Sequence, residues 1–98
     1  MDIDSSYFEE VVSNINKEDI AIMALLHSNG AVDPIYAIKT LNIREQTQMS
    51  KSSLNLILNR LKFASLINSI NSTSKYSIYL TEFGKAALHI KTNGGMTL

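Results

Sequence analysis

The segment from Ser50 to Ile67, SKSSLNLILNRLKFASLI, constrains the fold more than any other part of this chain. Its apolar residues recur at the spacing of one buried helical stripe: Leu54, Ile57, Leu58 and Leu61. Ser50 is a good N-cap, because its hydroxyl can accept a hydrogen bond from a free amide of the first helical turn. The segment therefore predicts an amphipathic helix whose other face is rich in Ser, Asn, Lys and Arg.

A pattern of two short strands follows this helix directly. Residues 66–70 alternate between apolar and polar, residues 71–75 form a polar turn, and residues 76–80 alternate again. Thr81 is then positioned to cap a last helix that runs to about Lys91. The order of helix, hairpin and helix predicts a mainly α chain with a small β-hairpin.

This ordered set resembles the winged helix-turn-helix DNA-binding proteins, in particular the small regulators of the MarR, ArsR and PadR types. The resemblance covers about residues 20–90. It rests on Ser50-Lys51-Ser52-Ser53-Leu54, Asn59-Arg60-Leu61, Ala64-Ser65-Leu66-Ile67, the wing residues Lys75 and Tyr76, and Leu80-Thr81 followed by Gly84. It implies a winged helix-turn-helix fold, which is α+β (mainly α with a small β-hairpin wing), and a function in binding double-stranded DNA.

The side chains on the outer face of the helix have the chemistry that DNA contacts require. Short hydrogen-bonding groups suit base edges in the major groove, and asparagine can pair bidentately with adenine. Basic groups and hydroxyls suit phosphates. An exposed Leu56 would contact a thymine methyl, whereas a buried Leu56 would belong to the core. The predicted DNA-binding residues are Ser50, Lys51, Ser52, Ser53, Asn55, Leu56, Asn59, Arg60, Thr73, Ser74 and Lys75. The alternative is an ordinary surface helix followed by a solvated hairpin turn.

The charges are divided unequally along a chain whose net charge is zero. Up to Pro34 there are seven acidic residues and one basic residue, which gives this part a net charge of −6. From Ile35 onward there are eight basic and two acidic residues, which gives +6. This asymmetry coincides with the start of the predicted DNA-binding part and favours contact with nucleic acid, although charges scattered on a solvated surface are the simpler reading.

The amino-terminal part carries an apolar stripe of its own. Residues 5–15 predict a first helix with apolar positions at Phe8, Val11, Val12 and Ile15. A wide stripe on a terminal helix needs a covering surface, from its own domain or from a second copy. Because a small domain often gains stability by association, we expect a homodimer held mainly by these residues. Residues 1–92 are expected to form one domain with an N-terminal dimerisation helix, and residues 93–98 a flexible tail.

The middle of the chain predicts two further helices. Residues 16–29 are apolar almost all round and indicate a buried central helix, capped by Asn16 and ended by Asn29-Gly30. Asp33-Pro34 predicts the start of another helix with Ile35, Ile38 and Leu41 facing inward and Ile43 as a further candidate. The apolar spacing does not continue cleanly through residues 42–49, so the supporting helix that the family places before the recognition helix is expected as two short pieces or as one bent piece. The glycine often found in the family's turn is absent.

Catalytic and membrane functions find no support in the sequence. The chain has no cysteine, and His27 and His89 lie far apart without nearby carboxylates at metal-ligand spacing. We therefore expect no enzyme activity, no metal and no cofactor. No apolar run approaches the length of a membrane span, and the acidic amino terminus differs from a signal peptide. We expect a cytoplasmic protein with no membrane partner.

Three functions remain open at this point. The resemblance first implies a homodimeric transcriptional regulator that represses by occupying a promoter. The layout is also similar to the TubR-type centromere-binding proteins of plasmid partition, through Asn29-Gly30, Ser50-Lys51 and the wing residues Ser74-Lys75. Either role could involve a partition or transcription partner protein. The third possibility is a protein-interaction module that kept the fold and lost DNA binding, which zero net charge and Leu56 in place of an arginine both favour.

Overall fold

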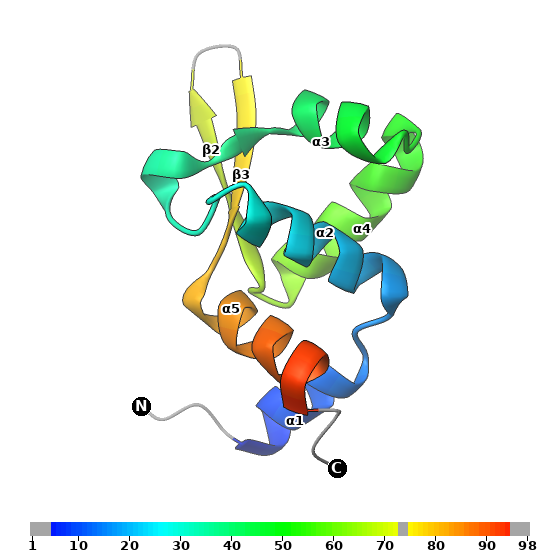
Figure 1. Ribbon diagram of the computed structural model, residues 1–98, viewed down its shortest axis with the longest axis vertical. Coiled ribbons are helices and arrows are strands. Elements are labelled where there is room, and N and C mark those ends of the chain that lie inside the picture. Colours follow the sequence, from blue (N-terminus) through cyan, green and yellow to red (C-terminus); the bar gives the residue numbers. More distant parts are fainter. Residues whose placement is uncertain (1–4, 73–74, 95–98) are drawn as a thin grey trace.

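The computed structural model describes residues 5–72 and 75–94, and it arranges them as helices around a small antiparallel sheet (Figure 1). In chain order the elements are α1 (Ser5–Ser13), α2 (Lys17–Ser28), the 3₁₀ turn η1 (Pro34–Tyr36), β1 (Ile38–Lys39), α3 (Thr40–Thr47), α4 (Lys51–Phe63), β2 (Ile67–Ser72), β3 (Lys75–Leu80), α5 (Glu82–His89) and the π-helical turn η2 (Ile90–Gly94). The predicted order of helix, hairpin and helix is confirmed. The turn η2 extends into the segment predicted as a tail.

Helix α2 is the central helix, as its composition predicted, and it crosses the middle of the molecule in Figure 1. Ile22, Met23 and Leu26 on this helix are almost completely buried. Asn16 caps it: the Asn16 side chain accepts a hydrogen bond from the Asp19 amide at 2.9 Å, and the Asp19 carboxylate accepts one from the Asn16 amide at 3.1 Å. This reciprocal pair is a capping box, and it fixes where the helix starts.

The sheet has three strands in the order β1-β3-β2, so the sequence prediction of a two-stranded wing missed one strand. Strand β3 lies in the centre and pairs antiparallel with both neighbours, with Ile78 opposite Ser69 of β2 and opposite Ile38 of β1. The Leu80 amide donates to the Ala31 carbonyl at 2.7 Å, just beyond the end of α2. The sheet is thereby joined to the central helix.

The helix predicted from Asp33-Pro34 is divided into two short pieces, the turn η1 and helix α3, which is one of the two forms that the sequence left open. Asp33 does cap a turn, since its carboxylate accepts from the Ile35 amide at 3.1 Å, but this turn ends at Tyr36. Ile35 is 84% exposed instead of inward-facing, and Leu41 is also exposed. The second piece is α3, which overlaps the stretch of residues 42–49 whose spacing was ambiguous. The apolar residues that suggested a single helix are divided among the turn (Ile35), the strand β1 (Ile38) and α3 (Leu41), which explains the error.

The first helix is covered inside the chain. Val12 and Ile15 belong to the buried core, while Phe8 and Val11 are partly buried against it. Phe8 also meets Phe83 of α5 edge-on, with ring centroids 5.0 Å apart, and Figure 1 shows α1 and α5 side by side. The reason for predicting a dimer through these four residues is therefore corrected, because their covering surface is the protein's own domain.

Candidate nucleic-acid interface

The start of α4 presents a polar, solvent-exposed turn. Ser50 is the N-cap that the sequence predicted, and its hydroxyl oxygen accepts a hydrogen bond from the Ser53 amide at 3.1 Å. The hydroxyl proton remains available to a further acceptor. Lys51, Ser52 and Asn55 are exposed, as is Ser53. Five of the predicted contact residues thus lie together on the first turns of one helix.

The opposite face of α4 anchors the helix in the core. All four residues of the predicted stripe are buried: Leu54, Ile57, Leu58 and Leu61. Leu56 is 69% exposed and Asn59 is exposed, so both lie away from that stripe. The choice that the sequence left open for Leu56 is settled in favour of the surface.

Arg60, which the sequence predicted as a DNA contact, is engaged in an ion pair within the fold. Its guanidinium forms an ion pair with Asp19 of α2, whose side chain is only 3% exposed. The other oxygen of the same carboxylate caps the Asn16 amide. Because Asp19 is buried, removing Arg60 from it would leave a carboxylate without its counter-charge. Arg60 therefore has a structural role in joining α2 to α4.

In the turn between α3 and α4, a glutamine adopts the left-handed conformation for which glycine is often used. Gln48 adopts a left-handed conformation, with φ +62° and ψ +21°, and its side chain donates to the Glu45 carbonyl at 2.8 Å. A non-glycine residue in this region is disfavoured by roughly 1–2 kcal/mol. The helix-turn-helix geometry is thus reached at the cost of local backbone strain.

Arg44 was not among the residues that the sequence predicted as DNA contacts. It lies in the last helical turn of α3, next to the connection to α4. Its side chain is partly buried, and its Nε atom is buried without a hydrogen-bond partner in the described part of the chain. No local pattern distinguished it, because the apolar spacing of residues 42–49 did not show which face of a helix is buried. Its unusual environment only becomes visible once α3 is packed in the fold.

The wing supplies fewer described candidates than the sequence proposed. Thr73 and Ser74 lie outside the described residues. Lys75 begins β3, and its side chain is likewise outside them. Lys62 of α4 donates to the Ser69 hydroxyl at 2.8 Å and lies 5.9 Å from the centre of the Tyr76 ring. The base of the wing is therefore tied to the carboxyl end of α4.

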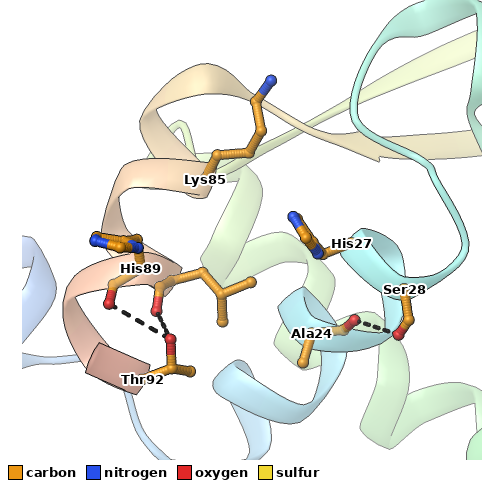
Figure 2. A pocket seen from close by; sticks show the side chains of 7 residues that line it. Ala24, His27, Ser28, Lys85, His89 and Thr92 are labelled. Atoms are coloured by element: carbon orange, nitrogen blue, oxygen red, sulfur yellow. Dashed lines mark hydrogen bonds between the residues drawn. The ribbon is translucent and has the colours of Figure 1, made fainter.

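A pocket of about 380 Å³ lies between α2 and α5, and both histidines line it (Figure 2). His27 lies on α2 and His89 on α5, with Lys85 also lining the pocket. The Ser28 hydroxyl donates to the Ala24 carbonyl at 2.9 Å, and Lys85 forms an ion pair with Glu82. Within the part of the chain that the structure describes, the residues lining this pocket include no Asp or Glu, and no group of three or more His, Cys, Asp or Glu could hold a metal ion. The described helices also include none with the length and apolarity to cross a bilayer.

Comparison with known proteins gives two close similarities, although no family model matches the chain. The DNA-binding protein TubR of Priestia megaterium (strain ATCC 12872 / QMB1551) is 32% identical over 84 residues, which is 86% of this chain and 83% of that protein. The solved structure of TubR from Bacillus megaterium pBM400 superposes with a TM-score of 0.85 at 30% identity, over 90% of this chain and 98% of that one. Sequence and fold agree over nearly the whole length, and the chain therefore belongs to the TubR family.

Proposed function

We propose that this protein binds double-stranded DNA as the centromere-binding adaptor of a plasmid partition system. The observation that carries the proposal is family membership, since the relative in P. megaterium is named as a DNA-binding protein. The match spans 86% of the chain, so it is not confined to one generic helix. It favours the TubR-type partition role over the promoter repressor that the sequence analysis placed first.

The geometry at the start of α4 supports the DNA-binding part of this proposal. Lys51, Ser52 and Asn55 are exposed on a helix whose other face is fixed in the core. The first amides of a helix have no acceptor within it, and they form the positive end of the helix dipole. A polar helix start of this kind can enter a major groove while its backbone and Lys51 approach the phosphates.

The arrangement of binding sites on DNA distinguishes partition from repression. Fragments of the host plasmid would be selected by the full chain, and the bound fragments would be sequenced. A partition adaptor should recover an array of repeated sites in one region of the plasmid. A single palindrome within a promoter would instead favour the repressor, and no enrichment over random fragments would contradict both.

The salt dependence of binding tests the proposal against the protein-interaction module. With three or four phosphate contacts per subunit, a dimer should give a log–log slope of affinity against salt near about −5 to −7. Zero net charge does not prevent this, because the part from Ile35 onward carries +6. A slope close to zero on duplex DNA would favour the interaction module.

We also propose that the protein acts as a homodimer, through a different surface from that predicted first. Phe63, at the carboxyl end of α4, is 93% exposed, and Leu56 lies two turns earlier on the same helix. Tyr7 of α1 is 49% exposed but stacks on Phe83, with ring centroids 6.4 Å apart. Exposed apolar residues that no intramolecular contact covers support pairing through α4.

Two matched variants separate the candidate surfaces. Phe63→Lys and Tyr7→Lys each place a charge on an exposed aromatic position, so both should fold. Sedimentation equilibrium should show a weakened dimer for Phe63→Lys and an unchanged dimer for Tyr7→Lys. The reverse result would return the interface to α1. Deletion of residues 1–15 is unsuitable for this purpose, because it removes the core residues Val12 and Ile15.

A non-enzymatic, cytoplasmic role completes the proposal. Plasmid DNA is a cytoplasmic ligand. Incubation of the protein with duplex DNA and Mg²⁺ should leave the DNA uncut, and fragmentation above the level of a mock purification would contradict this expectation.

A further inference from the structure

The two arginines of the helix-turn-helix have opposite electrostatic surroundings. Arg60 is paired with the buried carboxylate of Asp19. Arg44 has no ion pair among the described residues, although its side chain is partly buried and its Nε atom is shielded from solvent without a hydrogen-bond partner. Its two terminal nitrogens are not among the buried atoms that lack a hydrogen-bond partner, so within the guanidinium only Nε is both buried and unpaired. Arg44 therefore holds an uncompensated charge at the surface of the turn.

A small pocket adjoins this charge. Its volume is about 270 Å³, and it is lined by residues from the end of α3 and from the turn: Leu41, Arg44, Glu45, Gln48 and Met49. Met49 directly precedes Ser50, the N-cap of α4. The pocket, which we term the elbow pocket, thus lies at the junction with the amino end of a 13-residue helix. The partial positive charge of that end favours an anion nearby.

The chemistry of the guanidinium narrows the choice of anion. Arginine remains charged at any physiological pH, and its planar fork of donors matches phosphate geometry. A partly buried charge without a partner costs stability, and an anion that binds only in the complex would remove that cost. Glu45 lies on the same pocket and opposes an anion, so Arg44 must outweigh one carboxylate that is exposed to water.

We propose that the elbow pocket receives a backbone phosphate of the DNA duplex, with the terminal nitrogens of Arg44 donating to it. This inference rests on the proposed function of DNA binding. A contact of this type fixes the position of α4 on the duplex and carries no sequence information. Arg44 was not among the DNA-binding residues that the sequence predicted.

The test measures DNA affinity against salt for Arg44→Gln, with Lys17→Gln as its control. Both changes remove one positive charge, and Lys17 is an exposed residue at the start of α2. Arg44→Gln should lower affinity for cognate and random duplex alike by about tenfold. It should also make the salt slope shallower by about 0.9 per subunit. Lys17→Gln should change neither quantity.

Two further variants test the electrostatic argument. Arg44→Lys keeps the charge without the fork, so the slope should stay while affinity falls. Glu45→Gln removes the opposing carboxylate and should raise affinity by about two- to fivefold at low salt. If Glu45→Gln leaves affinity unchanged at low salt, no phosphate lies in the elbow pocket.

Thermal unfolding separates a binding role from a structural one. An uncompensated charge contributes nothing favourable to the free protein, so Arg44→Gln should unfold at the same temperature as the wild type or higher. A clear fall in unfolding temperature would assign Arg44 to the fold and overturn the inference. An unchanged salt slope for Arg44→Gln in a protein that does bind DNA would overturn the inference alone. Absence of duplex binding by the wild type would overturn the proposed function together with it.

Discussion

The two ends of α4 are built in opposite ways. At the amino end, one side-chain cap from Ser50 holds the first turn, and Lys51 and Ser52 extend into solvent. At the carboxyl end, the Leu66 amide donates to the Leu61 carbonyl at 2.9 Å, which closes a Schellman motif. The same end is joined to α2 through Arg60 and to α5 through contacts at Leu66.

This difference separates stability from binding along one helix. A helix that is anchored at one end can hold its other end in a fixed position, with little intramolecular contact to lose there. We call the carboxyl end of α4 the anchored end and its amino end the presented end. Substitutions at the anchored end should change the free energy of unfolding. Substitutions at the presented end should change DNA binding with little effect on stability. Substitutions at the two ends of α4 test this division.

Gly84→Ala should be the most damaging single change at the anchored end. A Cβ atom at Gly84 would lie well inside van der Waals contact of the Leu66 carbonyl oxygen, and 2.8 Å from a methyl group of Leu80. That oxygen accepts from the Thr81 amide at 3.1 Å, so it cannot move away freely. We expect a loss of about 3 kcal/mol or more, since overpacking against backbone exceeds the helical gain of alanine, about 1 kcal/mol.

Chemical denaturation of Gly84→Ala beside Ala86→Gly measures this effect. Ala86 is exposed on the same helix, so its replacement by glycine should cost only about 1 kcal/mol. If Gly84→Ala is as mild as the control, α5 can shift away from Leu66, and the carboxyl end of α4 is less firmly anchored than we infer.

Asp19→Ala should be the next largest, because it removes two contacts at once. It deletes the cap on the Asn16 amide, worth about 1 kcal/mol, and the partner of Arg60. Arg60 is 49% exposed on its side chain and can turn to water, which lowers the cost below that of a fully buried pair. We expect about 2–3 kcal/mol by urea unfolding. Glu18→Ala, an exposed neighbour, should change stability by less than about 0.5 kcal/mol. Similar values for the two variants would contradict a structural role for the Asp19–Arg60 pair.

The parts that could be predicted from the sequence are those fixed by local chemistry. Ser50, Thr81 and Asn16 were each predicted as helix caps, and each side chain accepts the expected amide hydrogen bond. The stripe of α4 and the strands of the hairpin follow from periodicities that a few neighbouring residues define. Caps and stripes were sufficient to recognise the winged helix-turn-helix, and the TubR-type layout among its alternatives.

The parts that could not be predicted depend on contacts between distant segments. Arg60 meets Asp19 across 41 positions of the chain, and no local pattern distinguishes a paired arginine from an exposed one. Strand β1 has only two residues, too few for an alternating pattern to form. The surface that covers the apolar stripe of α1 could not be predicted from the sequence of α1 alone. The stripe itself does not reveal whether Phe83 or a second chain covers it.

Asn55→Ala addresses the presented end and should leave stability within about 0.5 kcal/mol. Asn55 is exposed, and a bidentate pair with adenine is worth about 1–3 kcal/mol of discrimination. We expect the variant to lose preference at one base pair per half-site. Lys51→Ala should instead weaken binding to every sequence by a similar factor. Competition binding with single-base variants of the site measures both. An unchanged preference profile for Asn55→Ala would mean that α4 is not read through this face.

Gln48→Gly should give the smallest effect, and it compares the backbone on either side of α4. Gln48 before the helix and Ser65 after it are the described non-glycine residues with positive φ, at +62° and +66°. Glycine relieves the left-handed strain, but it loses about 0.5–1 kcal/mol of chain entropy and, at Gln48, the side-chain bond to Glu45. We expect Gln48→Gly to stabilise the protein by at most about 0.5 kcal/mol and Ser65→Gly by slightly more, because no side-chain bond of Ser65 is lost. Gln48→Ala keeps the left-handed strain without the side-chain hydrogen bond, and it should be the least stable of the three variants by thermal unfolding.

The DNA affinity of all three variants should equal that of the wild type, since the turn already has the geometry that glycine would adopt. A changed affinity for Gln48→Gly alone would show that the presented end depends on the rigidity of this turn.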